Sequence, residues 1–277
     1  MKSKLKDTGI SFLYILIPIG VLCLLAIILT PIIGFLTISN YISLPYDEIS
    51  FKSLIEYIGY YFSQSVYWIL AISFIISLPI YLLIFKKNEK NFFKTIKLNK
   101  ANIKFIIVSS IIGISLNFAL LGITNILNID YYNTVVNILS NADSRILYIV
   151  VLLIIEPFFS EILFRGVILR QLTNSYSLIM SIIIQNLLFV LYYSSTDFLK
   201  ITVAFIVGII SATICLYGDS LWNSILFHIL FKLSSLVIYI VIIYMNLNIT
   251  HYLIISIIAS LIIILSLIHL KKIHNCQ

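Results

Sequence analysis

Long apolar stretches recur from one end of this chain to the other, and they limit its fold more than any other feature. A hydrocarbon layer about 30 Å thick requires roughly 20 apolar residues for each helical crossing. Apolar residues fill 61% of the 277 positions and charged residues only 10%. A water-soluble globule could not bury that much apolar surface, so lipid must be the solvent for most of the chain.

The apolar runs between polar breaks predict an all-α, polytopic membrane helical bundle of about eight transmembrane helices. No internal repeat or linker divides the sequence, so a single integral membrane domain is predicted for residues 1–277. The predicted helices span residues 10–37, 65–85, 104–128, 145–172, 176–194, 198–217, 220–246 and 251–270.

Two segments near the N-terminus need separate interpretation. The apolar stretch from Ile10 to about Leu36 is too long for the hydrophobic region of a signal peptide, so we expect a retained first helix. Residues 41–64 mix aromatic and apolar residues with charged ones such as Glu48 and Glu56. This mixture predicts a helix that lies at the outer membrane interface.

The basic residues predict one orientation in the membrane. The connection from Lys86 to Lys104 carries seven lysines against the single acid Glu89, and the positive-inside rule places it in the cytoplasm. An even number of crossings then places both termini in the cytoplasm. The external loops, at 129–143 and 246–250, almost lack Lys and Arg. The abundance of Ile, Lys and Asn is typical of AT-rich bacterial genomes, which favours a bacterial plasma membrane.

The net charge of +7 does not indicate a nucleic-acid-binding protein, because the basic residues lie in short connections and not on an amphipathic face. Cys23, Cys215 and Cys276 lie far apart, and no second His or Cys stands at metal-ligand spacing from His228. We therefore predict no metal, no cofactor and no nucleic-acid partner.

Ionisable residues within the predicted spans are concentrated in the fourth helix. Such a side chain costs about 3 kcal/mol on insertion scales and usually faces a partner or a cavity. Glu161 and Arg165 are four residues apart and can pair, whereas Glu156 and Ser160 share a different face. Pro157 lacks a backbone donor and can bend the helix at this point.

Two further helices carry polar residues that could meet the fourth. In the fifth helix, Asn186, Phe189 and Tyr193 fall on one stripe, which we expect to face the bundle. In the seventh, His228 and Lys232 share a face, and a buried lysine needs a carboxylate such as those of the fourth helix.

These residues, between about 145 and 235, resemble the motifs of the CAAX-protease and bacteriocin-processing (CPBP, Abi) family of intramembrane proteases. The run from Ser160 to Gly166 is similar to its first motif, Glu-Glu-x-x-x-Arg followed by Gly. Phe189 to Tyr193 stands at the second motif, Phe-x-x-x-His, and His228 to Lys232 at the third, His-x-x-x-Asn. Three motifs in order are far more specific than any one of them.

The resemblance implies a role for each motif position. In the family, the first glutamate and the second-motif histidine activate water for peptide hydrolysis, and the third-motif histidine and asparagine stabilise the oxyanion. Here the three positions that depart from the motifs are Ser160, Tyr193 and Lys232. The motif positions that are retained are Glu161, Arg165 and His228.

The replacements remove the water-activating half of such a site. A serine without an adjacent neutral histidine cannot readily act as a general base, and a tyrosine hydroxyl with an ordinary pKa near 10 is poorly matched to that task. Glu156 could substitute as water activator from one turn away. A fifth helix that begins near Tyr176 places Tyr193 deeper than Ser160, whereas a start near Ser181 reduces the difference.

We therefore predict a family member with a degraded catalytic set, a non-catalytic or weakly catalytic pseudoenzyme. Its partners would be membrane lipid and a peptide, either a bacteriocin or a prenylated or membrane-embedded peptide, or another membrane protein. Bacteriocin self-immunity is the biological setting that the resemblance implies.

Two alternatives stay open. The first is an active intramembrane endopeptidase that uses Glu156 or Glu161 with His228. The second is a transporter or channel subunit, which predicts Glu/Lys pairs along a continuous pore; the sequence contains no inverted repeat to favour it.

Overall fold

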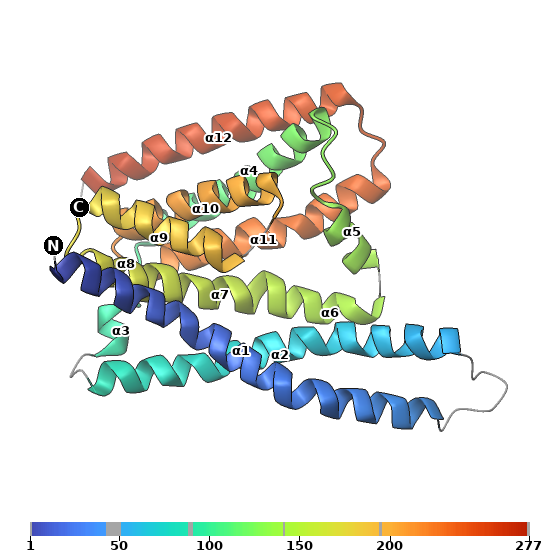
Figure 1. Ribbon diagram of the computed structural model, residues 1–277. Helices are drawn as coiled ribbons and strands as arrows, with labels where there is room; N and C mark the ends of the chain where they lie inside the picture. The colour runs from blue at the N-terminus through green and yellow to red at the C-terminus, as the bar shows by residue number, and fades with distance from the viewer. Residues whose placement is uncertain (1, 43–50, 88–90, 141, 194–195, 276–277) are drawn as a thin grey trace.

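The computed structural model describes residues 2–42, 51–87, 91–140, 142–193 and 196–275, and in these ranges helices make up almost all of the chain (Figure 1). This confirms the predicted all-α membrane bundle. The elements are α1 (Lys2–Ile42), α2 (Phe51–Lys87), α3 (Phe92–Thr95), α4 (Ile103–Ile126), α5 (Asn133–Ser140), α6 (Ala142–Val150), the π-helix η2 (Val151–Ile155), α7 (Glu156–Glu161), the π-helix η3 (Ile162–Ile168), α8 (Leu169–Leu172), α9 (Leu178–Tyr193), α10 (Phe198–Tyr217), α11 (Leu221–Tyr244) and α12 (Ile249–Asn275).

Within the described ranges, seven helical segments are long and apolar enough to cross a membrane, and one of them, Arg145–Leu172, runs through α6, η2, α7, η3 and α8. The predicted helix at 176–194 is present as α9, whose 16 residues span only about 24 Å at 1.5 Å per residue. In Figure 1, α9 ends short of the end of the bundle that α11 and α12 reach, and the two termini lie together at the opposite end.

The separate interfacial helix predicted at 41–64 is wrong for the residues that the structure describes. α2 begins at Phe51 and continues unbroken to Lys87, so Glu56 belongs to the same helix as the predicted span at 65–85. The physical reason is that the first proline in this segment is Pro79, so no residue before it removes a helical donor. The rest of the predicted segment, with Asp47 and Glu48, lies partly in 43–50, outside the described residues.

α4 lies at close range to both α11 and α12 because glycines face the two neighbours. A Cβ at Gly113 would meet the backbone carbonyl of Phe227 in α11, and one at Gly122 would meet the backbone of Tyr252 and Ser256 in α12. In lipid, helix association depends on such close packing of small residues more than on a hydrophobic driving force.

A buried amide adds a directional contact between α4 and α11. Asn117 Nδ2 donates to the carbonyl of Phe231 at 2.7 Å and lies 2.9 Å from Ser234 Oγ, while the hydroxyl of Tyr132 donates to Asn117 Oδ1 at 2.6 Å. Buried polar groups must be paired, so this cluster fixes the position of α11 along α4.

The lysine-rich connection holds the start of α11 in place. The amide of Leu221 donates to the carbonyl of Lys97 at 3.0 Å, and Ser220 Oγ donates to the carbonyl of Asn99 at 3.0 Å. Lys97 also forms an ion pair with Asp219 in the α10–α11 turn. α11 carries His228 and Lys232, so this connection helps to set the level at which both side chains enter the bundle.

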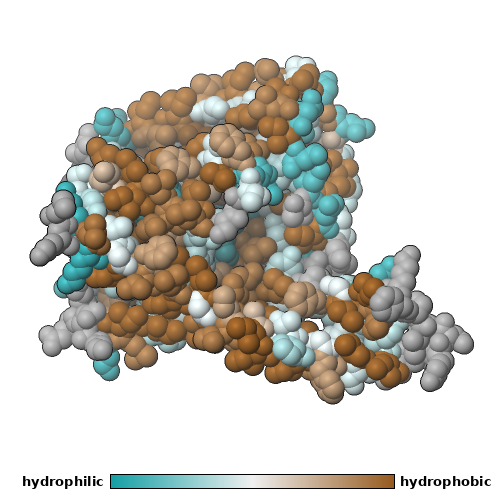
Figure 2. Space-filling view, viewed as in Figure 1, coloured by the Kyte–Doolittle hydropathy of each residue, from teal (hydrophilic) through white to brown (hydrophobic). Residues whose placement is uncertain are grey.

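The surface agrees with a lipid environment. Figure 2 shows hydrophobic residues over the middle of the molecule and hydrophilic ones gathered toward its two ends. Within the described residues, α1 and α12 bury the smallest share of their most apolar windows, 17% and 11% respectively, which is consistent with contact with lipid.

We expect Gly113→Ala to lower the thermal stability of the protein, because the added methyl group forces α4 away from α11. Overpacking of this kind costs about 1–3 kcal/mol. Gly20→Ala in α1 is the matched control, since nothing lies within 4 Å of a Cβ there. The measurement is thermal unfolding of both variants in the same detergent. Equal melting temperatures for the two variants would contradict the close α4–α11 contact.

Candidate active site

The helix of the fourth predicted span switches from α-helical to π-helical hydrogen bonding in two places. The first-motif residues lie in α7 and in the second π-helix. The two π-helices η2 and η3 flank α7. The amide of Glu156 bonds to the carbonyl of Val151, five residues back, directly before Pro157, which has no amide to donate. π-turns shift the side chains that follow them around the helix and are frequent at functional sites. Glu156 and Glu161 are five residues apart in α7, so their side chains project about 140° apart around the helix and enter two different polar clusters.

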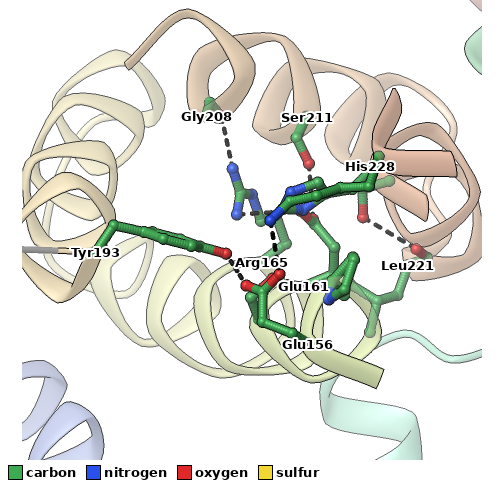
Figure 3. A network of polar contacts seen from close by, with 12 residues as sticks. Glu156, Glu161, Arg165, Tyr193, Gly208, Ser211, Leu221 and His228 are labelled. Atoms are coloured by element: carbon green, nitrogen blue, oxygen red, sulfur yellow. Dashed lines mark hydrogen bonds and ion pairs between the residues drawn. The ribbon is translucent and has the colours of Figure 1, made fainter. Parts of the chain in front are cut away.

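The first cluster, around Glu161, is closed to solvent. Glu161 Oε1 lies 2.8 Å from His228 Nδ1 and 3.2 Å from Arg165 Nη1, and Glu161 Oε2 accepts a hydrogen bond from Ser211 Oγ at 2.7 Å. Arg165 Nη2 donates to the carbonyl of Gly208 at 3.0 Å, as Figure 3 shows. The predicted Glu161–Arg165 pair is thereby confirmed, and α10 and α11 supply its other partners.

The second cluster, around Glu156, joins three helices. Lys232 Nζ in α11 donates to Glu156 Oε2 at 2.9 Å, and the hydroxyl of Tyr193 in α9 donates to Glu156 Oε1. Figure 3 shows Tyr193 pointing across from α9 toward this carboxylate. Lys232 Nζ also lies 5.6 Å from the centre of the Tyr193 ring. The predicted pairing of a bundle lysine with a carboxylate of the fourth helix is confirmed.

The two residues at the water-activating motif positions do not form a general base pair. Ser160 is buried, and its Oγ donates to the carbonyl of Pro157 at 3.0 Å. α9 begins at Leu178, between the two starting points considered from the sequence. Tyr193 contacts Glu156, which lies one turn before Ser160. The stripe predicted to face the bundle does so: Asn186 and Phe189 are buried, and Phe189 lies under Arg165, whose guanidinium carbon is 4.4 Å from the ring centre.

A cavity of about 250 Å³ lies beside the two clusters. The motif positions His228, Tyr193 and Lys232 contribute to its wall, whereas Glu161, Arg165 and Ser160 do not. Most of the wall is apolar or aromatic. The lining residues are Tyr131, Phe189, Val190, Tyr193, Lys200, Ile201, Val203, Ala204, Val207, His228, Phe231 and Lys232.

The sequence analysis did not single out three polar residues of the site, Ser211, Tyr131 and Lys200. Ser211 stands three residues after Gly208 on one face of α10, and this spacing is the one signal that could have indicated it. Tyr131 lies in the connection before α5, outside the membrane helices. Burial, with a smaller effect of Asp197, raises the pKa of Tyr131 to about 12, so its hydroxyl is neutral at physiological pH.

Gly208 has two functions in this arrangement. Its carbonyl accepts the Arg165 hydrogen bond, and a Cβ at this position would collide with the side-chain amide of Asn186. The same amide donates from Nδ2 to the carbonyl of Phe205 at 2.8 Å. The glycine therefore lets α9 approach α10 closely enough to form the cavity wall.

The other described histidines lie away from this site. His251 is exposed at the start of α12, 2.6 Å from Asn248 Oδ1, and His269 is exposed near the end of the same helix. Among the described residues, no three His, Cys, Asp or Glu side chains come together as a metal-binding group.

Together, the helical bundle and the enclosed polar clusters define a multi-pass membrane protein with a buried polar site inside the bundle. Residues 142–234 match the model of the family described as type II CAAX prenyl endopeptidase Rce1-like. The match covers the part of the chain in which the motifs lie, and it supports the predicted resemblance to the CAAX-protease (CPBP) family. Comparisons with curated proteins and with solved structures gave no match.

We expect Lys232→Ala to destabilise the protein, because it leaves the Glu156 carboxylate buried without its cation. Losing one partner of a buried pair costs up to about 3–5 kcal/mol, and the 27% exposure of the Lys232 side chain places the cost toward or below the lower end of that range. The double variant Glu156→Gln/Lys232→Ala removes both charges and should recover much of the loss in thermal unfolding. Lys200→Ala, at a half-exposed lysine whose Nζ lies 3.9 Å from Asp197 Oδ2, is the control. A double variant no more stable than Lys232→Ala alone would contradict the pairing.

Proposed function

We propose that this protein is a non-catalytic or weakly catalytic member of the CAAX-protease family that binds a membrane-embedded peptide in the cavity between α9, α10 and α11. One observation carries the proposal: every carboxylate oxygen of the site has a basic or hydroxyl partner. Glu161 is held by His228, Arg165 and Ser211, and Glu156 by Tyr193 and Lys232. Neither glutamate lines the cavity, so neither is placed to take a proton from a water molecule bound there.

The wall of the cavity supports peptide binding. Ligand sites are mostly apolar with a few polar groups that fix orientation, and this wall combines apolar residues of α9 and α10 with the donors Lys232 and Lys200. A peptide backbone carbonyl or a terminal carboxylate could accept hydrogen bonds from these ammonium groups. Apolar side chains of the same peptide would contact residues such as Val203 and Phe231.

The biological setting that we propose is self-immunity to a bacteriocin in a bacterial plasma membrane, with both termini in the cytoplasm. The lysine-rich connection and the position of the two termini at one end of the bundle (Figure 1) support this orientation. A protein that only needs to bind and retain a peptide has no requirement for the water-activating residues, and this accounts for Ser160 and Tyr193.

A second candidate function, intramembrane peptide hydrolysis, is favoured by one contact. The 2.8 Å separation between Glu161 Oε1 and His228 Nδ1 fixes the imidazole, and His228 lines the cavity. A carboxylate that orients a histidine in this way is a recurring part of catalytic sites. His228 would then be the general base, with the ammonium of Lys232 as the donor to the oxyanion.

A gain-of-function experiment separates the two candidates. We expect the wild-type protein in proteoliposomes not to cleave a fluorogenic prenylated peptide. We expect Ser160→Glu/Tyr193→His to gain cleavage, because it restores the family's pair and places the histidine at position 193, in the cavity wall. A positioned general base contributes about 10²–10⁴-fold to rate. Ser160→Gln/Tyr193→Phe is the control of similar size without a base, and it should remain inactive.

We expect His228→Ala to leave peptide binding within about twofold of wild type, since the binding wall is built from many residues. The measurement is photo-crosslinking of a labelled hydrophobic peptide to the protein in proteoliposomes, at matched folded yield. Wild-type turnover that His228→Ala and Glu161→Gln both abolish, at normal folded yield, would overturn the proposal and establish the endopeptidase instead.

A further inference from the structure

A second and larger cavity, of about 1110 Å³, lies at the end of the bundle that carries both termini. It is formed by the first turns of α1, the last turns of α2, α3, and the segment from η3 to the residues after α8. None of its lining residues lines the candidate active site. Its volume exceeds the roughly 300–1,000 Å³ that is usual for small-molecule sites.

The lining of this cavity changes from charged to apolar along α1. Lys6, Ile10, Leu13 and Ile17 line it at successive spacings of three and four residues, so they form one stripe on the helix. From Lys6 to Ile17 this stripe covers about 16 Å at 1.5 Å per residue. The cavity therefore has a basic end near the terminus of the bundle and an apolar end deeper within it.

The acidic residue of the cavity does not neutralise its cations. Asp7 Oδ1 accepts a hydrogen bond from Gln171 Nε2 at 2.7 Å, and Asp7 Oδ2 accepts one from Ser175. Neither Lys6 nor Arg170 has an ion pair within the part of the chain that the structure describes. With one carboxylate against two cations, the lining carries a net charge of +1.

Arg170 has hydrogen-bonding capacity that the protein does not fill. Its Nε is buried and has no partner among the described residues, and its Nη2 has only Cys215 Sγ, 4.0 Å away. A buried donor without an acceptor is costly. Because Nε is enclosed, an anion in the cavity would meet Arg170 through the terminal nitrogens of its guanidinium, and phosphate oxygens suit that planar group well.

We propose that this cavity binds an anionic phospholipid from the leaflet on this side of the membrane. The phosphate lies against Arg170 and Lys6, and an acyl chain runs inward along Ile10 and Ile17. Basic pockets between membrane helices are known recognition sites for acidic headgroups. The apolar wall below the cations is what favours a lipid over a free anion, because a free anion would leave that wall without a partner.

The bound lipid would connect α1 to the helix segment that carries the site. α1 packs against α8 and η3, and Asp7 and Gln171 already form one hydrogen bond between α1 and α8. A phosphate between Lys6 of α1 and Arg170 of α8 would add a second connection. The lipid would thus raise the stability of the bundle without entering the candidate active site.

The test uses the full chain, delipidated in detergent, with native mass spectrometry and thermal unfolding at increasing dioleoylphosphatidylglycerol. The wild type should bind this lipid and be stabilised by it, with weaker binding of dioleoylphosphatidylcholine. Lys6→Gln and Arg170→Gln should each weaken binding about fivefold. Lys94→Gln/Lys272→Gln, at two exposed lysines outside the cavity, is the control and should bind as wild type does.

Further arms identify the occupant. Ile17→Trp keeps the charges but fills the apolar end, and it should also weaken lipid binding, whereas Arg170→Lys should partly retain it. Inorganic phosphate at millimolar concentration should not compete. The proposal is overturned if phosphate competes fully, if both lipids bind equally, or if the charge variants bind as wild type does. Displacement of the lipid by the prenylated peptide at equal concentration would also overturn it and reassign the cavity to peptide binding.

Discussion

The cost of placing charge inside a membrane protein governs the arrangement of this bundle. Glu156, Glu161, Arg165 and Lys232 lie in the interior with formal charges that sum to zero, and each contacts at least one opposite charge. An isolated ion in a low-dielectric interior is costly, and removing one partner of a pair exposes that cost in full. The helices that carry these residues can therefore pack well only where the charges meet.

Backbone geometry makes these meetings possible. Glu156 and Glu161 project from different faces of α7 toward different neighbours, and Gly208 lets α9 and α10 lie close together. Gly113 does the same for α4 and α11, the helix that carries His228. Positions without side chains thus set the distances at which the charged side chains bind one another. The close approach of α9 and α10 at Gly208 also forms part of the wall of the apolar cavity beside them.

The departures from the family's motifs compensate one another. A serine in place of a glutamate and a lysine in place of an asparagine each add one unit of positive charge to the site. Glu156, which lies outside the motifs, balances the added lysine directly, with 2.9 Å between Lys232 Nζ and Glu156 Oε2. Tyr193 fits the same arrangement, because its hydroxyl donates to Glu156 where the family has a histidine. Such a site is suited to a stable fold and to binding, which is why we propose a binding protein.

The solvent, the fold class, the approximate spans and the family motifs could be predicted from the amino-acid sequence, because hydropathy over twenty residues and spacing within one helix are local properties. The Glu161–Arg165 pair, four residues apart, was predictable for the same reason. The tertiary structure decided which carboxylate takes which cation, that Ser211 reaches Glu161, that residues 51–64 extend α2, and where the two cavities lie. These features depend on the rotation and depth of one helix against another, which are set by contacts between distant residues, such as those at the glycines, and which no local pattern records.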